Sequence, residues 1–184
     1  MWVDCDHVIC SEGWVADENG NCVPEPEPCD TNDPILDDET IQADFLNSVW
    51  GSTSSGIPID DRKERGGYIV SKDGGYDIVY FPPTFTTDAC GMYPPANWTS
   101  YIPDNVVGYV HSHPFYIGEN TKGVCGDEGE ESYQGGPSDP DYEFLMMLSN
   151  HLGEFTLTGF VLDGSKIYAY DYARNIIKYN RCGY

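Results

Sequence analysis

The sequence contains the stretch Val106-Val107-Gly108-Tyr109-Val110-His111-Ser112-His113-Pro114, an apolar run that ends in two histidines one residue apart. A short apolar run of this kind predicts a buried strand, here over residues 105–112. Because side chains alternate along a strand, His111 and His113 are expected on one face. Two imidazoles and a carboxylate from elsewhere in the chain make a three-ligand zinc site with an open fourth position, which a hydrolytic metal requires.

The segment Ser138-Asp139-Pro140-Asp141 has the pattern of a helix N-terminus, with Ser138 as N-cap, proline in the first turn and an acidic residue three positions on. It predicts a helix over 139–152. The apolar stripe of that helix is expected to be Phe144, Leu145, Leu148 and Leu152. Capping alone accounts for the pattern, but such a helix would also hold the Asp141 carboxylate beside the Ser138 hydroxyl. Asp141 is therefore a candidate third ligand.

A glutamate stands at the entrance of a predicted strand over 66–71, in the segment Glu64-Arg65-Gly66-Gly67. This strand is expected to form a hairpin with residues 76–81. Because Glu64 belongs to the charged run 60–65, one interpretation is a solvated surface carboxylate. The other is a general base, which must lie within hydrogen-bond reach of the water that it activates.

In this order along the chain, these residues resemble the JAMM/MPN (JAB) metalloprotease family. The family's pattern is a glutamate that opens a strand near a glycine, a later His-x-His-Pro, and then Ser-x-x-Asp. The resemblance covers roughly residues 60–170. It implies an α+β fold, in which a mixed, cytidine-deaminase-like sheet is flanked by helices. It also implies cleavage of amide bonds, often isopeptide bonds to lysine.

Carried over residue by residue, the resemblance implies that His111, His113 and Asp141 bind Zn²⁺. Glu64 would take the proton from the zinc-bound water, and Ser138 would steady the oxyanion of the tetrahedral intermediate. The chain would then hydrolyse a peptide or isopeptide bond, with a protein or peptide as substrate. The alternative is a non-catalytic secreted relative that binds a protein partner through its acidic, tyrosine-rich surface. A third hypothesis is an effector that blocks its own cleft until it is cleaved or meets a partner.

Two departures from the family pattern bear on the cleft. Between His113 and Ser138 lie 24 residues, where the family usually has seven. This insertion (residues 115–137) must leave and return beside the metal, so it is expected to form a lip or lid. Residues 82–104 are proline-rich and predict a loop where the family has a helix. The chain is more similar to divergent JAB-like domains of bacterial secreted or Rhs-type proteins, which share the Glu-Arg-Gly-Gly opening.

Seven cysteines indicate an oxidising compartment, secreted or extracytoplasmic. Four of them (Cys5, Cys10, Cys22 and Cys29) lie in residues 1–30, which predict a small disulfide-stapled module with a hairpin over 13–23. A second zinc site is the alternative, although no Cys-x-x-Cys is present. A proline-rich linker is expected up to residue 36, followed by the metallopeptidase-like domain over 37–184. Cys90 and Cys125, one in each long loop, are predicted to pair, while Cys182 is left without an assigned partner.

The net charge of −22 argues against nucleic acid and anionic membranes as partners. A lysine-rich substrate would be attracted, but solubility alone also accounts for the charge. No apolar run is long enough for a transmembrane helix, and no signal peptide is visible at the start of the chain. A helix is expected over 37–50 and strands over 155–162, 166–171 and 176–179, which completes an α+β order. The sequence indicates neither the substrate nor the oligomeric state.

Overall fold

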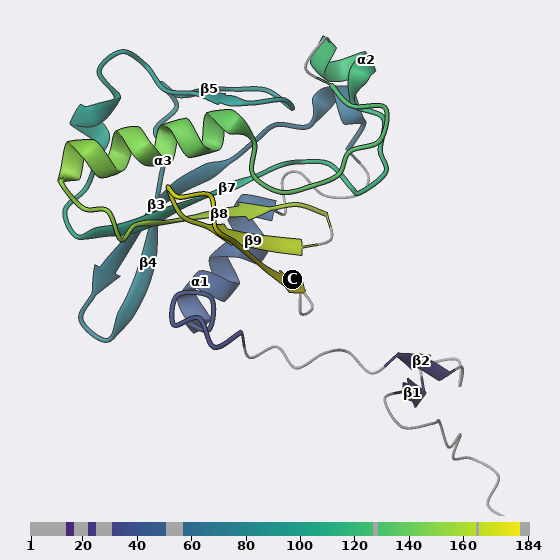
Figure 1. Ribbon diagram of the computed structural model, residues 1–184, viewed down its shortest axis with the longest axis horizontal. Helices are drawn as coiled ribbons and strands as arrows, with labels where there is room; N and C mark the ends of the chain where they lie inside the picture. Colours follow the sequence, from purple (N-terminus) through teal and green to yellow (C-terminus); the bar gives the residue numbers. More distant parts are fainter. Residues whose placement is uncertain are drawn as a thin grey trace, which may run out of the picture.

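The computed structural model describes residues 14–16, 22–24, 31–50, 57–126, 129–164 and 166–180. Within them the fold is α+β, with a six-stranded mixed sheet at its centre and few helices (Figure 1). The strands of this sheet are β3 (Gly66–Lys72), β4 (Gly75–Tyr80), β7 (Val106–Ser112), β8 (Thr158–Leu162), β9 (Lys166–Tyr170) and β10 (Ile176–Asn180). Each of them was expected from the sequence, although β8 begins three residues later than predicted.

The strand order is β10-β9-β8-β7-β3-β4, and only β7 and β8 are parallel neighbours. A parallel connection needs a crossover, which helix α3 (Asp139–Leu152) provides. The helix has the predicted bounds and the predicted N-cap, Ser138. The predicted apolar stripe of this helix is wrong at Leu152. Leu152 is 38% exposed, because the chain leaves the helix directly after it, at Gly153 in the left-handed conformation, so the buried stripe ends at Leu148.

The other predicted helix is α1 (Glu39–Asp44), which continues as a π-helical segment (Phe45–Trp50). Its cap is Asp38, whose carboxylate accepts hydrogen bonds from the backbone N–H groups of Thr40 and Ile41. Short elements make up the rest: β5 (Thr86–Thr87), β6 (Met92–Tyr93), α2 (Lys122–Cys125) and the 3₁₀ turns Ile59–Asp61 and Trp98–Tyr101. Residues 82–104 are therefore mostly loop, as predicted.

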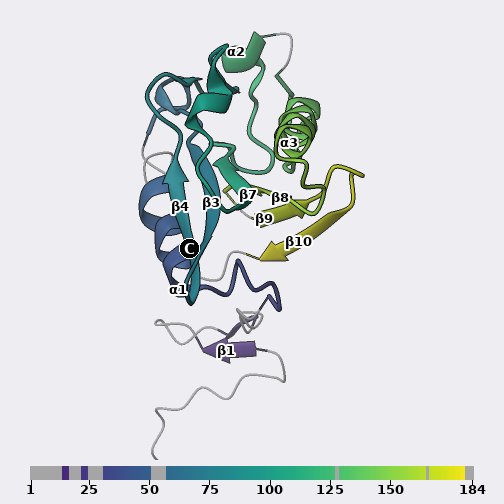
Figure 2. The ribbon, with the colours of Figure 1, turned by 90° about the vertical axis from the view of Figure 1, so that its left-hand side faces the viewer.

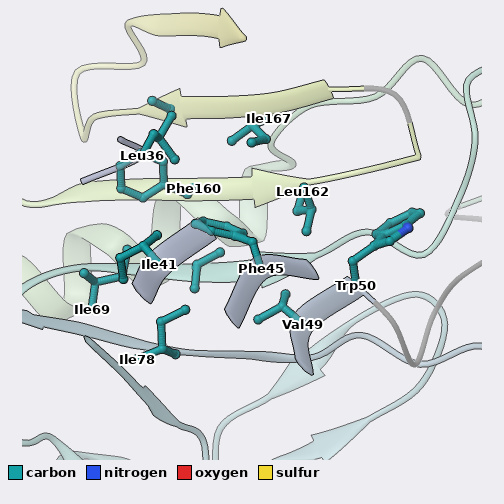
Figure 3. Packing of buried hydrophobic residues seen from close by; sticks show 12 residues of the cluster. Leu36, Ile41, Phe45, Val49, Trp50, Ile69, Ile78, Phe160, Leu162 and Ile167 are labelled. Atoms are coloured by element: carbon teal, nitrogen blue, oxygen red, sulfur yellow. The ribbon is translucent and has the colours of Figure 1, made fainter. Parts of the chain in front are cut away.

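The central sheet is covered by α1 on one face and by α3 on the other, as Figure 2 shows. The α1 face is an aliphatic core that also contains Phe45 and Phe160. Figure 3 shows Ile41, Phe45 and Val49 directed from the helical segment toward it. The α3 face is rich in buried tyrosines, among them Tyr68, Tyr109 and Tyr170. Alternation along β7 serves both faces, since Val110 packs on the α1 side and Tyr109 on the α3 side.

The strand pairing of the predicted hairpin and the predicted disulfide between the two long loops are both confirmed. The strands β1 (Trp14–Ala16) and β2 (Cys22–Pro24) pair antiparallel, as the predicted hairpin requires. Cys90 and Cys125 form the predicted disulfide, which is consistent with an extracytoplasmic location. The cysteine pairing in residues 1–30, the turn of that hairpin, residues 25–30 of the linker and Cys182 lie outside the described residues. The last part of the predicted linker, residues 31–36, is described, and it ends in a turn whose Leu36 is buried in the core on the α1 face. No helix in the described part of the chain is both long and apolar enough to span a bilayer.

Candidate metal centre

The two histidines lie where β7 ends, on the same face, as their spacing predicted. The residue between them, Ser112, points the other way and is fully buried. Its hydroxyl accepts a hydrogen bond from the Arg65 backbone N–H (3.0 Å), and its own N–H donates to the Arg65 carbonyl (2.8 Å). His113 is tied to the next strand by its N–H, which donates to the Leu162 carbonyl (2.9 Å). The main chain that carries the two histidines is therefore hydrogen-bonded to the segments that lie on either side of it, at Arg65 and at Leu162.

Glu64 is brought to the histidines by the close approach of β3 to β7. Gly66 pairs with His111 in the ladder, and a Cβ on Gly66 would lie 2.4 Å from the Val110 carbonyl oxygen, so only glycine fits there. On the other side, the Glu64 N–H donates to the Asp88 carbonyl (2.7 Å). Glu64 is only 5% exposed, which excludes the interpretation as a solvated surface charge.

Asp141 reaches the histidines from the first turn of α3. Its Oδ2 accepts hydrogen bonds from both the backbone N–H (2.6 Å) and the hydroxyl (2.8 Å) of Ser138. The first of these bonds is the carboxylate half of the capping box expected from the sequence. The Tyr109 hydroxyl donates to the Asp141 carbonyl (2.8 Å), which ties this turn to β7. Ser138 itself is exposed, and its hydroxyl is directed at Asp141.

The ligand atoms of these side chains converge on one point. His111 Nε2 and His113 Nε2 are 3.1 Å apart, and they lie 2.9 Å and 3.3 Å from the Asp141 carboxylate oxygens. A tetrahedral zinc ion with bonds of about 2.0–2.1 Å would hold its ligand atoms about 3.3 Å apart. Glu64 Oε1 lies farther out, 3.7 Å from His113 Nε2. Glu64, His111 and His113 form a buried group that could hold a metal ion, and Asp141 adds a second carboxylate to it.

The charges at this point are strongly coupled. Burial raises the pKa of Glu64 to about 8, against the opposing effect of His113. Burial by itself would lower the pKa of His113, but the Asp141 and Glu64 carboxylates outweigh it and raise that pKa to about 9. Burial likewise works against ionisation of Asp141, yet the two histidines hold its pKa well below the usual range. Without a cation the cluster therefore retains protons at neutral pH, and a divalent cation would replace them.

A cleft of about 390 Å³ opens over the five predicted site residues. Three parts of the chain form its walls: loop 82–104 (Phe85, Met92, Tyr93), the insertion (Phe115, Thr121, Tyr133) and α3 (Phe144, Met147). The insertion thus borders the cleft, as a lip would. The structure brings together all of Glu64, His111, His113, Ser138 and Asp141, from segments far apart in the sequence.

Two contacts at the site were not expected from the sequence. Tyr133, in the insertion, lies with its hydroxyl 3.0 Å from His113 Nδ1. Tyr109 stacks its ring on that of His111, with centroids 5.5 Å apart and planes 6° from parallel. The alternation of Tyr109 with His111 along one strand could have revealed the second contact. Nothing in the spacing of Tyr133 indicates the first, because it depends on the path of the insertion.

A comparison of the sequence with protein-family models finds no match, and a comparison with curated proteins finds none either.

Proposed function

We propose that this chain is a zinc-dependent hydrolase of peptide or isopeptide amide bonds, with a JAMM/MPN-like site and an extracytoplasmic location. The observation that carries the proposal is the convergence of His111 Nε2 and His113 Nε2, 3.1 Å apart, on the Asp141 carboxylate, whose Oδ1 lies 2.9 Å from the first nitrogen and whose Oδ2 lies 3.3 Å from the second. Two neutral nitrogens and one carboxylate are a donor set that zinc takes in catalytic sites. The buried Glu64 beside them matches the role of a general base.

When bound there, zinc would lower the pKa of a water molecule and polarise the substrate carbonyl. Glu64 Oε1, 3.7 Å from His113 Nε2, would accept a proton from the attacking water and pass it to the leaving amine. The capping box keeps Asp141 in position while this happens. Ser138 would stabilise the developing negative charge on the carbonyl oxygen, for which its hydroxyl must turn from Asp141 to the substrate.

The variant Glu64→Gln tests the base directly. It keeps the size of the side chain, so zinc content should remain unchanged while the turnover of a peptide or isopeptide substrate falls about 10²–10⁴-fold. Turnover is followed with fluorogenic peptide and ε-linked isopeptide libraries. The matched control is Asp61→Asn, which changes an exposed carboxylate of the same charged run. Full activity in Glu64→Gln would overturn the assignment. Zinc binding with no hydrolysis in the wild type would favour the non-catalytic alternative.

A further inference from the structure

We propose that Tyr133 is a positioning residue of the metal centre, which holds the His113 ring so that Nε2 faces the metal. This inference rests on the proposed metal-binding function. The Tyr133 hydroxyl lies 3.0 Å from His113 Nδ1, and both side chains are buried, with 9% and 8% of their surface exposed. The contact is made from the insertion, the segment in which the chain departs most from the family pattern.

The chemistry of the imidazole explains why this contact matters. When Nε2 binds a metal, the ring carries its remaining proton on Nδ1, and that N–H needs an acceptor when it is buried. For His113 with a metal on Nε2, the Tyr133 hydroxyl, 3.0 Å from Nδ1, would be that acceptor. His111 differs, because its buried Nδ1 has no hydrogen-bond partner in the described part of the chain and its ring rests on Tyr109 instead. The hydrogen bond between His113 and Tyr133 would therefore orient one of the two histidine ligands.

The insertion is built to keep Tyr133 in place. Its two limbs pair through backbone hydrogen bonds, from the Gly118 N–H to the Tyr133 carbonyl (2.9 Å) and from the Tyr133 N–H to the Glu119 carbonyl (2.8 Å). The carboxylate of Glu119 forms an ion pair with the buried Arg62 (2.7 Å), which anchors one limb to the body of the domain.

Packing and a covalent bond add to this support. The Tyr133 ring contacts Phe115, with centroids 5.5 Å apart, in a small buried cluster that also includes Ala89. The Cys90–Cys125 disulfide lies against the same cluster and ties the insertion to loop 82–104. The last part of the insertion passes close to Tyr168, and a Cβ on Gly135 would lie 2.5 Å from the Tyr168 hydroxyl. The insertion is thus a structural part of the metal centre as well as a wall of the cleft.

The variant Tyr133→Phe removes only the hydroxyl, and its matched control is Tyr116→Phe, in the same insertion, where the ring contacts Trp50 and Arg62. Zinc affinity is measured by competition with a chromophoric chelator. We expect zinc to bind about 10–100-fold more weakly to Tyr133→Phe than to the wild type, and with unchanged affinity to the control. Circular dichroism verifies that both variants fold.

A second readout does not depend on activity. Long-range ¹H–¹⁵N spectra of the zinc-loaded wild type should show His113 protonated on Nδ1, with a resonance that shifts in Tyr133→Phe. A spectrum with the proton on Nε2, or equal zinc affinity in Tyr133→Phe and the wild type, would overturn the role of Tyr133 and leave the proposed function standing. Failure of the wild type to bind zinc would overturn both.

Discussion

The two faces of the central sheet differ in what their side chains can do. The α1 face buries mostly hydrocarbon side chains, among them Ile41, Phe45 and Phe160. The α3 face buries five tyrosines, Tyr68, Tyr109, Tyr142, Tyr168 and Tyr170, together with phenylalanine and aliphatic residues. A hydrocarbon face stabilises the fold by removing apolar area from water, but it has no group that can orient a ligand. Tyrosines bury a similar area and add hydroxyl groups that can.

The hydroxyl groups of the α3 face are used near the candidate metal centre. Tyr109 hydrogen-bonds to Tyr170 and donates to the Asp141 carbonyl, while its ring supports His111. We infer that both faces stabilise the fold and that only the α3 face also provides the geometry of the site. This division predicts that the two faces respond differently to substitution.

The largest effect on stability is expected from Phe45→Ala, which opens a cavity in the α1 face where Phe45 is 1% exposed. Substitutions of this kind cost about 3–5 kcal/mol of the free energy of unfolding. Zinc affinity should be unchanged under conditions in which the variant is folded. Urea denaturation of the metal-free protein and chelator competition measure the two quantities. A large loss of zinc affinity in Phe45→Ala would contradict the division between the faces.

The pH dependence should separate the metal-free from the zinc-loaded protein. In the folded chain the pKa of His113 is raised to about 9 and that of Glu64 to about 8. At a pH between the ordinary pKa of each group and its raised pKa, the folded chain therefore binds more protons than the unfolded chain. The metal-free protein should therefore lose stability as the pH rises from about 6 to 9. Zinc affinity should rise over the same range, by about tenfold for each pH unit, because the proton on His113 competes with the metal.

Thermal melts without zinc and chelator competition across this pH range check both slopes. The Phe45→Ala variant should keep both, since it leaves the cluster intact. A zinc affinity that does not depend on pH would show that no ligand proton is displaced.

A smaller effect on stability is expected from Tyr109→Phe, which removes one buried hydroxyl and keeps the ring on His111. The cost is about 1–3 kcal/mol, because the hydroxyl groups of Tyr109 and Tyr170 no longer pair and the Asp141 carbonyl loses its donor. Zinc affinity should nevertheless fall, because the hydroxyl ties the turn that carries Asp141 to β7. The matched control is Tyr76→Phe, a half-buried tyrosine packed against the α1 face, which should leave zinc affinity unchanged. Equal zinc affinity in the two variants would remove the distinction between the faces.

Much of the fold could be predicted from the sequence because its signals are local. The Ser138 cap and the apolar period gave the bounds of α3, and the apolar run before His111 gave β7 almost to the residue. The exposure of Leu152 could not be predicted, because periodicity shows which side of a helix is apolar but not where the neighbouring sheet ends.

In the candidate site, too, some residues could be predicted from the sequence and others could not. Glu64, His111, His113 and Asp141 were found as residue types in a spaced pattern, and the fold brings them together. The contact between Tyr133 and His113 could not be predicted, because the insertion folds back through non-local contacts such as the Cys90–Cys125 disulfide. Ser112 gave no signal either, since its role depends on the register between β3 and β7.

We propose above that this chain binds one zinc ion through His111, His113 and Asp141. Elemental mass spectrometry of the untagged protein tests it most directly, with His113→Ala measured alongside. We expect about one zinc ion per chain in the wild type and none in the variant. No zinc in the wild type after reconstitution, or an equal amount in His113→Ala, would contradict it.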